Sequence, residues 1–273
     1  MKSTVLAAVA TFALAAPAAA QTAPSWTGFY AGGRIGYAAA PLNTKESVQF
    51  DKNLDGNFSD TVTTAAGANA FSPGFCNGAA QSALASGGCK TNDDGLDYAI
   101  HAGADYQFGQ IVVGGLVEYG KANVESSVTA FSTTPANYVL TREMRGTFGA
   151  RARLGLDLQG TLPYVTAGMV RAKVRSSFST TNTANGFATR GGSGKENGYR
   201  VGGGFEKRFG PLAIGALYLF TNVKDEDFRI DVTRGTAAAT NPFVLTNTAG
   251  TQFRRSDRRF KSHSADVTMS FRF

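Results

Sequence analysis

The chain has 273 residues, with 27 Lys and Arg, 20 Asp and Glu and a formal net charge of +7. Its mean hydropathy is −0.13, and beyond residue 20 every apolar stretch is broken before it reaches the roughly 18 residues that a spanning helix requires. These features exclude a helical membrane protein. Nucleic acid is a poor partner despite the basic charge, because the first residues predict export.

Residues 1–20 have the pattern of a secretory signal peptide. A basic start at Lys2 precedes an apolar run at 5–16 and a small-residue ending of the A-x-A type. We predict cleavage after Ala20. Residues 21–273 then form the mature domain, which is delivered to the cell envelope.

Eight segments of the mature domain alternate apolar and polar residues with a period of two. Strands show this pattern when one face is apolar and the other polar. Each segment is long enough for a tilted membrane strand, which needs roughly 9–11 residues. In chain order the segments are 26–38, 96–108, 111–124, 142–158, 161–175, 196–209, 211–224 and 260–273.

The connections between the segments strictly alternate between short and long. The short ones lie at 109–110, at 159–160 and around Gly210, and each contains the Gly that a tight hairpin favours. The long ones cover 39–95, 125–141, 176–195 and 225–259. An even-stranded outer-membrane barrel has this form. We predict an all-β, eight-stranded, antiparallel up-and-down transmembrane β-barrel with long extracellular loops and both termini in the periplasm.

The first long connection contains the two cysteines of the chain, Cys76 and Cys89. An exported chain reaches an oxidising compartment, so this short spacing predicts a disulfide. If unstrained, it would stabilise its loop by about 3 kcal/mol. The alternative is a pair of free thiols.

The same connection contains a partial calcium motif. Asp51, Asn53, Asp55 and Gly56 match the start of a calcium loop, in which alternate oxygen ligands surround the ion and Gly permits the turn. Position twelve, however, is Val62 rather than the bidentate Glu. The alternative is a solvated turn, and we assign no metal and no cofactor to the chain.

Charged residues decide which strand faces point into the barrel. Arg151 and Arg153 share one face of the fourth segment, and an Arg that faces lipid near the midplane costs about 2–4 kcal/mol. The same reasoning places twelve charged residues in the lumen: Arg34, Asp105, Glu118, Arg151, Arg153, Asp157, Arg171, Lys173, Glu206, Arg208, Asp266 and Arg272. Side chains nearly fill a barrel of this size, so we expect a plug of ion pairs. In a narrow pore, the alternative, the slight cationic excess would favour anions.

Aromatic residues near the strand ends predict a girdle on the periplasmic side. They are Phe29, Tyr30, Phe108, Tyr164, Phe209 and Phe273. The seventh segment has apolar residues on both faces, including Leu217 and Leu219, so its register stays open.

A basic cluster lies where the fourth long connection returns to the membrane. It consists of Arg254, Arg255, Arg258, Arg259 and Lys261. Lipopolysaccharide presents phosphates at this level, and Arg binds phosphate through two parallel hydrogen bonds. The cluster predicts a lipopolysaccharide-binding site, with a solvated rim as the alternative.

A hydrolase, for example one that acts on lipid A, would need a serine within hydrogen-bond reach of a histidine and an acid behind it. His263 lies beside Ser262 and Ser264, and Asp266 lies on the same strand. Each is an odd number of residues from His263 and therefore points to the other face. We expect no enzyme and no catalytic residue.

The segment WTGFYAGGRIGY at 26–37, just after a signal peptide, resembles the opening strand of small Gram-negative outer-membrane β-barrel proteins. These are porin-family or surface-antigen proteins, similar in design to OmpA-like transmembrane barrels. The Phe271-Arg272-Phe273 ending is also similar. The resemblance implies an eight-stranded barrel inserted by the barrel assembly machinery, which recognises an aromatic C-terminal strand, here Phe271 and Phe273. Because the chain ends at Phe273, we expect no peptidoglycan-binding domain of the OmpA type.

Members of this family are mostly envelope-structural proteins or surface antigens, and some are called porins. We therefore expect an envelope-structural or surface-antigen role with a mostly plugged lumen. The alternatives are a small porin for passive diffusion and an adhesin that acts through its extracellular loops. Outer-membrane lipids, lipopolysaccharide and the assembly machinery are the expected partners.

Overall fold

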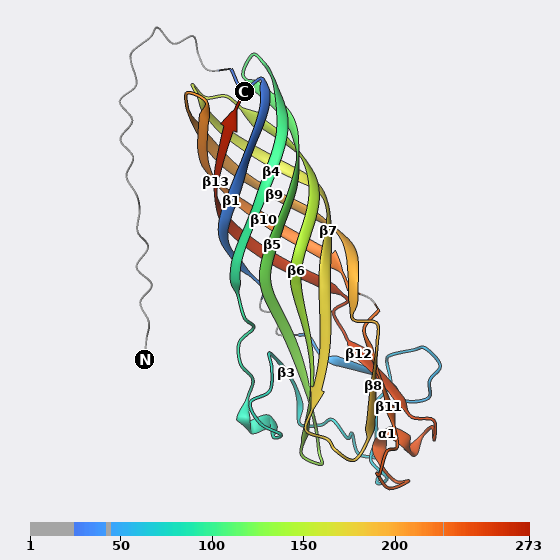
Figure 1. Ribbon diagram of the computed structural model, residues 1–273. Coiled ribbons are helices and arrows are strands. Elements are labelled where there is room, and N and C mark those ends of the chain that lie inside the picture. Colours follow the sequence, from blue (N-terminus) through green and yellow to red (C-terminus); the bar gives the residue numbers. More distant parts are fainter. Residues whose placement is uncertain (1–24, 42–44, 226) are drawn as a thin grey trace.

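The computed structural model describes residues 25–41, 45–225 and 227–273, so the predicted signal peptide lies outside the described residues. Eight antiparallel strands close into a ring in which each strand pairs with the next one along the chain and the last pairs with the first (Figure 1). The predicted eight-stranded antiparallel barrel is therefore confirmed. The strands are β1 (Gly28–Ala39), β4 (Gly95–Phe108), β5 (Ile111–Ser132), β6 (Ala136–Leu156), β7 (Thr161–Thr180), β9 (Ser193–Phe209), β10 (Leu212–Lys224) and β13 (Arg259–Arg272).

The predicted long connection at 125–141 is wrong. The strands β5 and β6 continue beyond the ring as a paired hairpin and turn only at 133–135. A bulge between Lys121 and Val124 shifts their pairing, which interrupts the two-residue period close to the predicted strand end. Beyond the bulge most residues of β5 are buried, so apolar residues no longer alternate with exposed polar ones.

The other long connections are also folded. Four short strands from three of them form a second antiparallel sheet in the order β2 (Val48–Asp51), β12 (Thr251–Arg255), β11 (Arg229–Thr233) and β8 (Gly186–Arg190). The strand β3 (Gly74–Asn77) pairs with β5, and two short helices, η1 (Ala85–Gly87) and α1 (Pro242–Leu245), complete the connections. We call the region beyond the ring, residues 45–92, 125–141, 176–192 and 227–258, the head. It lies at the end of the barrel opposite the C-terminus (Figure 1).

The outer face of the ring is a band of exposed apolar side chains. They include Phe29, Ile35, Tyr37, Tyr98, Ile100, Tyr106, Phe108, Val117, Tyr119, Phe148, Leu154, Val165, Met169, Tyr199, Phe205, Phe209, Tyr218, Val267, Met269, Phe271 and Phe273. Between these residues on β4, β6, β9 and β13 the inward positions are polar or small, as the alternation in the second, fourth, sixth and last segments predicts, whereas β10 places leucines inside. In the described part of the chain no helix is long and apolar enough to cross a membrane.

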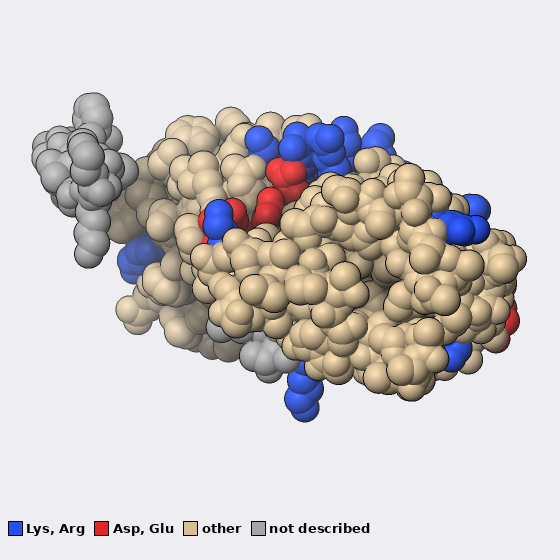
Figure 2. Space-filling model, turned by 90° about the horizontal axis from the view of Figure 1, so that it is seen from below, with Lys and Arg blue, Asp and Glu red and all other residues tan. Residues whose placement is uncertain are grey.

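Three apolar clusters fill the inside of the molecule. One contains Trp26, Val112 and Leu162 and lies at the end with the short turns. It also contains Leu217 and Leu219, so the face of the seventh segment that carries these leucines points inward. A second lies at the head end of the barrel and the third is the core of the head. Seen from the head end, Lys and Arg side chains gather along one side of the surface (Figure 2).

Candidate functional site

Glu118 is the centre of a buried ion-pair network in the middle of the lumen. Its carboxylate accepts hydrogen bonds from the guanidinium groups of Arg34 at 3.2 Å, Arg151 at 3.0 Å and Arg200 at 2.6 Å. Arg34 also donates to Asp97 at 2.7 Å and to Asp266 at 3.1 Å. All of these side chains are buried, so the network occupies the space that a channel would need.

A second group of ion pairs lies closer to the short turns. Arg153 donates to Asp105 at 2.8 Å and to both oxygens of Glu206 at 3.2 Å, and Arg272 donates to Asp105 at 2.6 Å. The guanidinium of Arg153 also lies 4.6 Å from the ring centroid of Tyr30. The two groups together pair five arginines with five carboxylates (Arg34, Arg151, Arg153, Arg200 and Arg272 with Asp97, Asp105, Glu118, Glu206 and Asp266).

Apolar layers close the lumen on both sides of this network. Toward the head, Met144, Val174 and Phe260 pack with small residues across the inside of the barrel. Toward the short turns, Trp26 is fully buried and donates from Nε1 to Asp157 at 3.1 Å. Buried charges need partners, and here each of the ten charged side chains pairs with at least one side chain of opposite charge.

The structure corrects two predicted lumen residues. Arg171 and Lys173 lie on the outer face of β7, where they are exposed, whereas Val170, Ala172 and Val174 point inward. The rule that keeps Arg out of lipid applies only within the apolar band, and both residues lie beyond Met169, the last apolar side chain on that face. With Arg171 and Lys173 outside, the five arginines and five carboxylates of the network balance, and these ten residues do not show the expected cationic excess.

Two further predicted lumen residues lie at the mouth near the short turns. Asp157 accepts hydrogen bonds from Trp26 and Gln107, and Arg208 donates to the carbonyl of Gly210 and to that of Ser25. Both are partly exposed, so they cap the barrel end and stand outside the central network.

The predicted set omits two members of the network, Asp97 and Arg200. Each has the inward parity of its strand, so the alternation alone identifies them. Two aromatic residues of the predicted girdle are also misplaced, because Tyr30 and Tyr164 are buried inside and contact Arg153. Phe29, Phe108, Phe209 and Phe273 are exposed on the outer face.

One of the five residues of the predicted lipopolysaccharide cluster lies inside the head and not on its surface. Arg255 is buried and makes two parallel hydrogen bonds to Glu46, at 2.7 and 2.8 Å. Arg254 lies 4.0 Å from the ring centroid of Phe58 in the head, and Lys261 pairs with Asp257 at 3.1 Å. Arg258 and Arg259 are exposed. The alternation of β12 turns Arg255 inward and away from Arg254, its neighbour in sequence.

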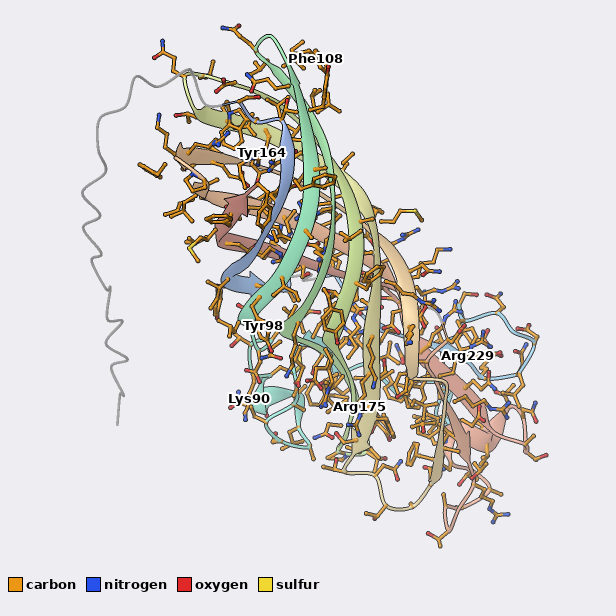
Figure 3. The ribbon with its side chains drawn as sticks, turned by 45° about the horizontal axis from the view of Figure 1, so that its top comes forward. Lys90, Tyr98, Phe108, Tyr164, Arg175 and Arg229 are labelled. Carbon is orange, nitrogen blue, oxygen red and sulfur yellow. A yellow bond between two sulfur atoms is a disulfide. The ribbon has the colours of Figure 1, made fainter. Side chains whose placement is uncertain are left out.

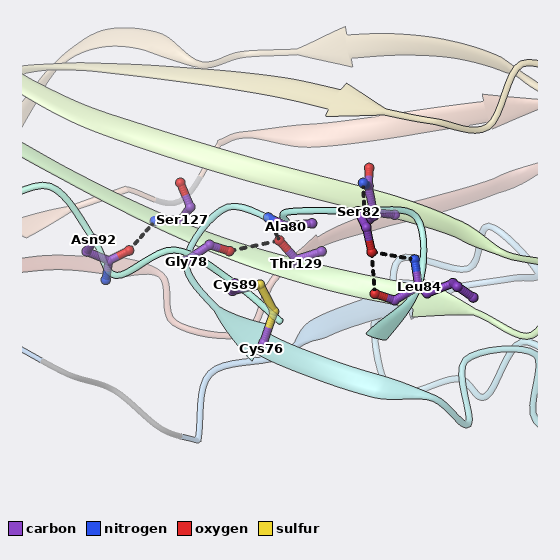
Figure 4. Close-up of a disulfide and its surroundings, with 10 residues drawn as sticks. Cys76, Gly78, Ala80, Ser82, Leu84, Cys89, Asn92, Ser127 and Thr129 are labelled. Carbon is purple, nitrogen blue, oxygen red and sulfur yellow. Dashed lines mark hydrogen bonds between the residues drawn. A yellow bond between two sulfur atoms is a disulfide. The ribbon is translucent and has the colours of Figure 1, made fainter. Parts of the chain in front are cut away.

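The disulfide between Cys76 and Cys89 is confirmed, and it closes a loop of the first connection that lies against β5 (Figure 4). Thr129 on β5 donates from its hydroxyl to the carbonyl of Gly78 at 2.8 Å and accepts from the amide of Ala80 at 3.1 Å. The covalent link therefore holds a segment that also pairs with the barrel hairpin.

The oxygens of the calcium-like turn bind the turn itself. Asp51 is buried and accepts hydrogen bonds from the backbone amides of Asp55 and Gly56 at 3.1 and 2.8 Å. The side chain of Asn53 donates to Asp55 at 2.9 Å. Within the described residues no group of three or more His, Cys, Asp or Glu could hold a metal ion.

His263 lies on the face opposite its serine and aspartate neighbours. Its Nδ1 contacts the Tyr218 hydroxyl at 2.5 Å, while Ser264 is buried inside and donates to Asp266 at 2.9 Å. His101 points into the lumen and contacts Ser270 at 2.9 Å.

The head has an aromatic core of its own. Phe50, Phe71, Tyr138, Phe243 and Phe253 are buried against one another, with ring centroids 4.3 to 6.4 Å apart. These residues come from the first, second and fourth connections. Because buried aromatic pairs add about 0.5–1.5 kcal/mol beyond their area, the head is a folded unit and not a set of separate loops.

A cavity of about 250 Å³ opens at the head, next to this core. Buried Phe71, Tyr138 and Phe243 line it together with Asn182 and Asn241, and all four long connections contribute. Asn182 donates to the Tyr138 hydroxyl at 2.9 Å, and burial raises the pKa of Tyr138. The described lining contains no charged side chain.

A second cavity of similar volume lies between the head and the barrel mouth. Its lining includes Glu46, Arg142, Asp257 and Arg259. Burial, and then the nearby Arg255, lower the pKa of Arg142 to about 10. Arg142 donates to the carbonyl of Asp257 at 3.0 Å.

Comparisons with known proteins find likenesses among solved structures. No protein-family model matches the chain, and no curated protein matches its sequence. The crystal structure of Neisserial surface protein A is similar over 90% of this chain and 98% of that chain, with 11% sequence identity and a TM-score of 0.38. The assignment of the fold therefore rests on the closed ring of eight strands itself.

Proposed function

We propose that the protein is an integral outer-membrane protein whose barrel is a sealed anchor and whose head acts at the cell surface, in an envelope-structural or surface-antigen role. The single observation that carries this proposal is the filled lumen. Five arginines and five carboxylates pair inside the barrel, with apolar layers on both sides. A passive pore needs a continuous water path, which this packing opposes.

The height of the outer band supports insertion in a membrane. Figure 3 shows Phe108 near one end of the barrel, Arg175 toward the head and Tyr98 between them. Ten residues of a strand that rises about 3.3 Å per residue and tilts by about 40° span about 25 Å, the height of the apolar band of outer-membrane barrels. Tyr98 and Phe108, ten residues apart on β4, are both exposed on the outer face.

The ends of the barrel support one orientation. Short turns in such barrels face the periplasm and long connections face outward, so we propose that the head lies outside the cell and the C-terminal end of β13 in the periplasm. Phe271 and Phe273 are exposed on the outer face of that end. We propose them as the signal for the barrel assembly machinery.

The conductance of the refolded protein in a planar bilayer tests the sealed lumen. A large porin reconstituted in parallel shows that the bilayer detects channels, and heat-dependent gel mobility shows that the barrel is folded. We expect a folded barrel without discrete conductance steps. Steady steps that change with lumen substitutions would refute the sealed anchor and favour the small porin.

The head cavity favours a second function, that of an adhesin. An uncharged lining with aromatic side chains and amide groups suits an uncharged, hydroxyl-rich ligand such as a sugar. Asn182→Ala changes the cavity lining, whereas Asn247→Ala makes the same change in the head outside it. Binding of neutral oligosaccharides that is lost in the first variant and kept in the second would support the adhesin. Equal behaviour of the two variants would refute it.

A further inference from the structure

Five cations lie together on the outer face of the barrel, just beyond the apolar band. They are Lys121 on β5, Arg171, Lys173 and Arg175 on β7, and Lys195 on β9, and all are exposed. We call them the cationic patch. Among the described residues, none of these five side chains forms an ion pair.

The register of the strands brings these charges side by side. Lys173 pairs directly with Lys195 across β7 and β9, and Arg171 and Arg175 flank Lys173 on the same face. Like charges opposite each other on a sheet are destabilising. The nearest acidic position across β6 is Glu143, opposite Arg175, and its carboxylate binds Arg145 at 2.9 Å. The patch therefore has an uncompensated positive charge.

The position of the patch specifies the anion. On β7 the exposed Val165 and Met169 precede Arg171, and on β5 the exposed Tyr119 precedes Lys121 by two residues. The cations thus begin where the band ends on the side of the head, at the level of the lipid headgroups. Arg offers paired donors to a phosphate and Lys offers a point charge.

We propose that the cationic patch binds the phosphate groups of anionic lipids in the outer leaflet, with Arg171, Lys173 and Lys195 as the central ligands. The inference rests on the proposed membrane location. The cationic patch is a different site from the cluster expected at 254–261, in which Arg255 is paired with Glu46 inside the head.

The test compares two triple variants of the full chain, refolded in detergent. Arg171→Gln/Lys173→Gln/Lys195→Gln removes the centre of the patch, and Lys52→Gln/Lys90→Gln/Arg234→Gln removes the same charge from the head. Each is titrated at low salt with fluorescent lipid A that carries two phosphates. A cation near an anionic membrane surface contributes about fivefold in affinity, so we expect the patch variant to bind about 100-fold more weakly and the head variant to bind like the wild type.

Three results would overturn the proposal. The first is a patch variant that binds lipid A as tightly as the wild type. The second is a head variant that loses as much affinity as the patch variant. The third is dephosphorylated lipid A that binds the wild type as well as the phosphorylated form does. Competition by millimolar inorganic phosphate would assign the patch to soluble anions and also overturn it. Heat-dependent gel mobility confirms the fold of each variant, so a folded, non-conducting barrel without lipid binding would leave the proposed function standing.

Discussion

Replacing Glu118 by Gln tests whether ion pairs hold the inside of the barrel together. The substitution keeps the shape of the side chain and removes the charge that Arg34, Arg151 and Arg200 share. Loss of one partner from a buried pair costs about 3–5 kcal/mol, because the remaining charge stays buried. Arg34 keeps two other carboxylates, whereas Arg151 and Arg200 have no second carboxylate within the described network. We therefore expect a loss of about 4 kcal/mol.

Urea unfolding of the barrel refolded in lipid vesicles measures this loss. Trp26 is the single tryptophan and is fully buried, so its fluorescence reports unfolding. With a slope of about 2 kcal/mol per M, the midpoint should fall by about 2 M. Glu143→Gln is the matched control, since its exposed pair with Arg145 at 2.9 Å should contribute at most about 1 kcal/mol.

The reasoning fails if Glu118→Gln and Glu143→Gln lower stability by the same small amount. A second comparison separates charge from packing. In the double variant Glu118→Gln/Arg200→Gln one unpaired guanidinium is removed as well, so part of the lost stability should return. A double variant with simply additive losses would indicate that packing, not charge, explains the single effect.

Three further outcomes follow from the packing. Phe253→Ala should cost the head about 3–5 kcal/mol, which limited proteolysis would detect as faster cleavage of the head while the heat-dependent gel shift of the barrel persists. Replacing Cys76 and Cys89 by Ser should lower the stability of the first connection by about 3 kcal/mol, and protection of the segment between them from protease would contradict this. Gly168→Ala should impair folding, because a Cβ there would lie 2.0 Å from the carbonyl oxygen of Ala150, whereas Gly146→Ala meets nothing within 4 Å; equal refolding yields would refute the steric argument.

The barrel could be predicted from the sequence because its constraints are local. From Phe148 to Leu158 and from Ala265 to Phe273, apolar residues alternate with polar residues or glycine, so one register satisfies both faces. On β7 apolar residues occupy both faces, as Val165 and Met169 outside and Leu162 and Val170 inside show. The inward face of this segment is therefore predicted from the charge of Arg171. That prediction is wrong because Arg171 lies beyond the apolar band, where an outward Arg does not face lipid.

The head could not be predicted in the same way. Its sheet consists of strands of four or five residues, too short for a periodic pattern. Phe50 on β2 pairs with Phe253 on β12, at the other end of the chain. Such pairing depends on barrel closure, which brings the first and fourth connections together. The cavity at the head is formed by residues from all four connections, so no local sequence motif could predict it.

The shared sheet of the head limits how this surface can diverge. Since β12 lies between β2 and β11 and β11 lies between β12 and β8, a change in one connection alters the hydrogen-bonding edge offered to another. Exchange of a single loop between related chains should therefore yield misfolded surfaces more often than exchange of the first, third and fourth together. In the proposed surface-antigen role, sequence variation would concentrate in the turns at 133–135 and 234–241, and antibodies against the sheet would recognise only the assembled conformation.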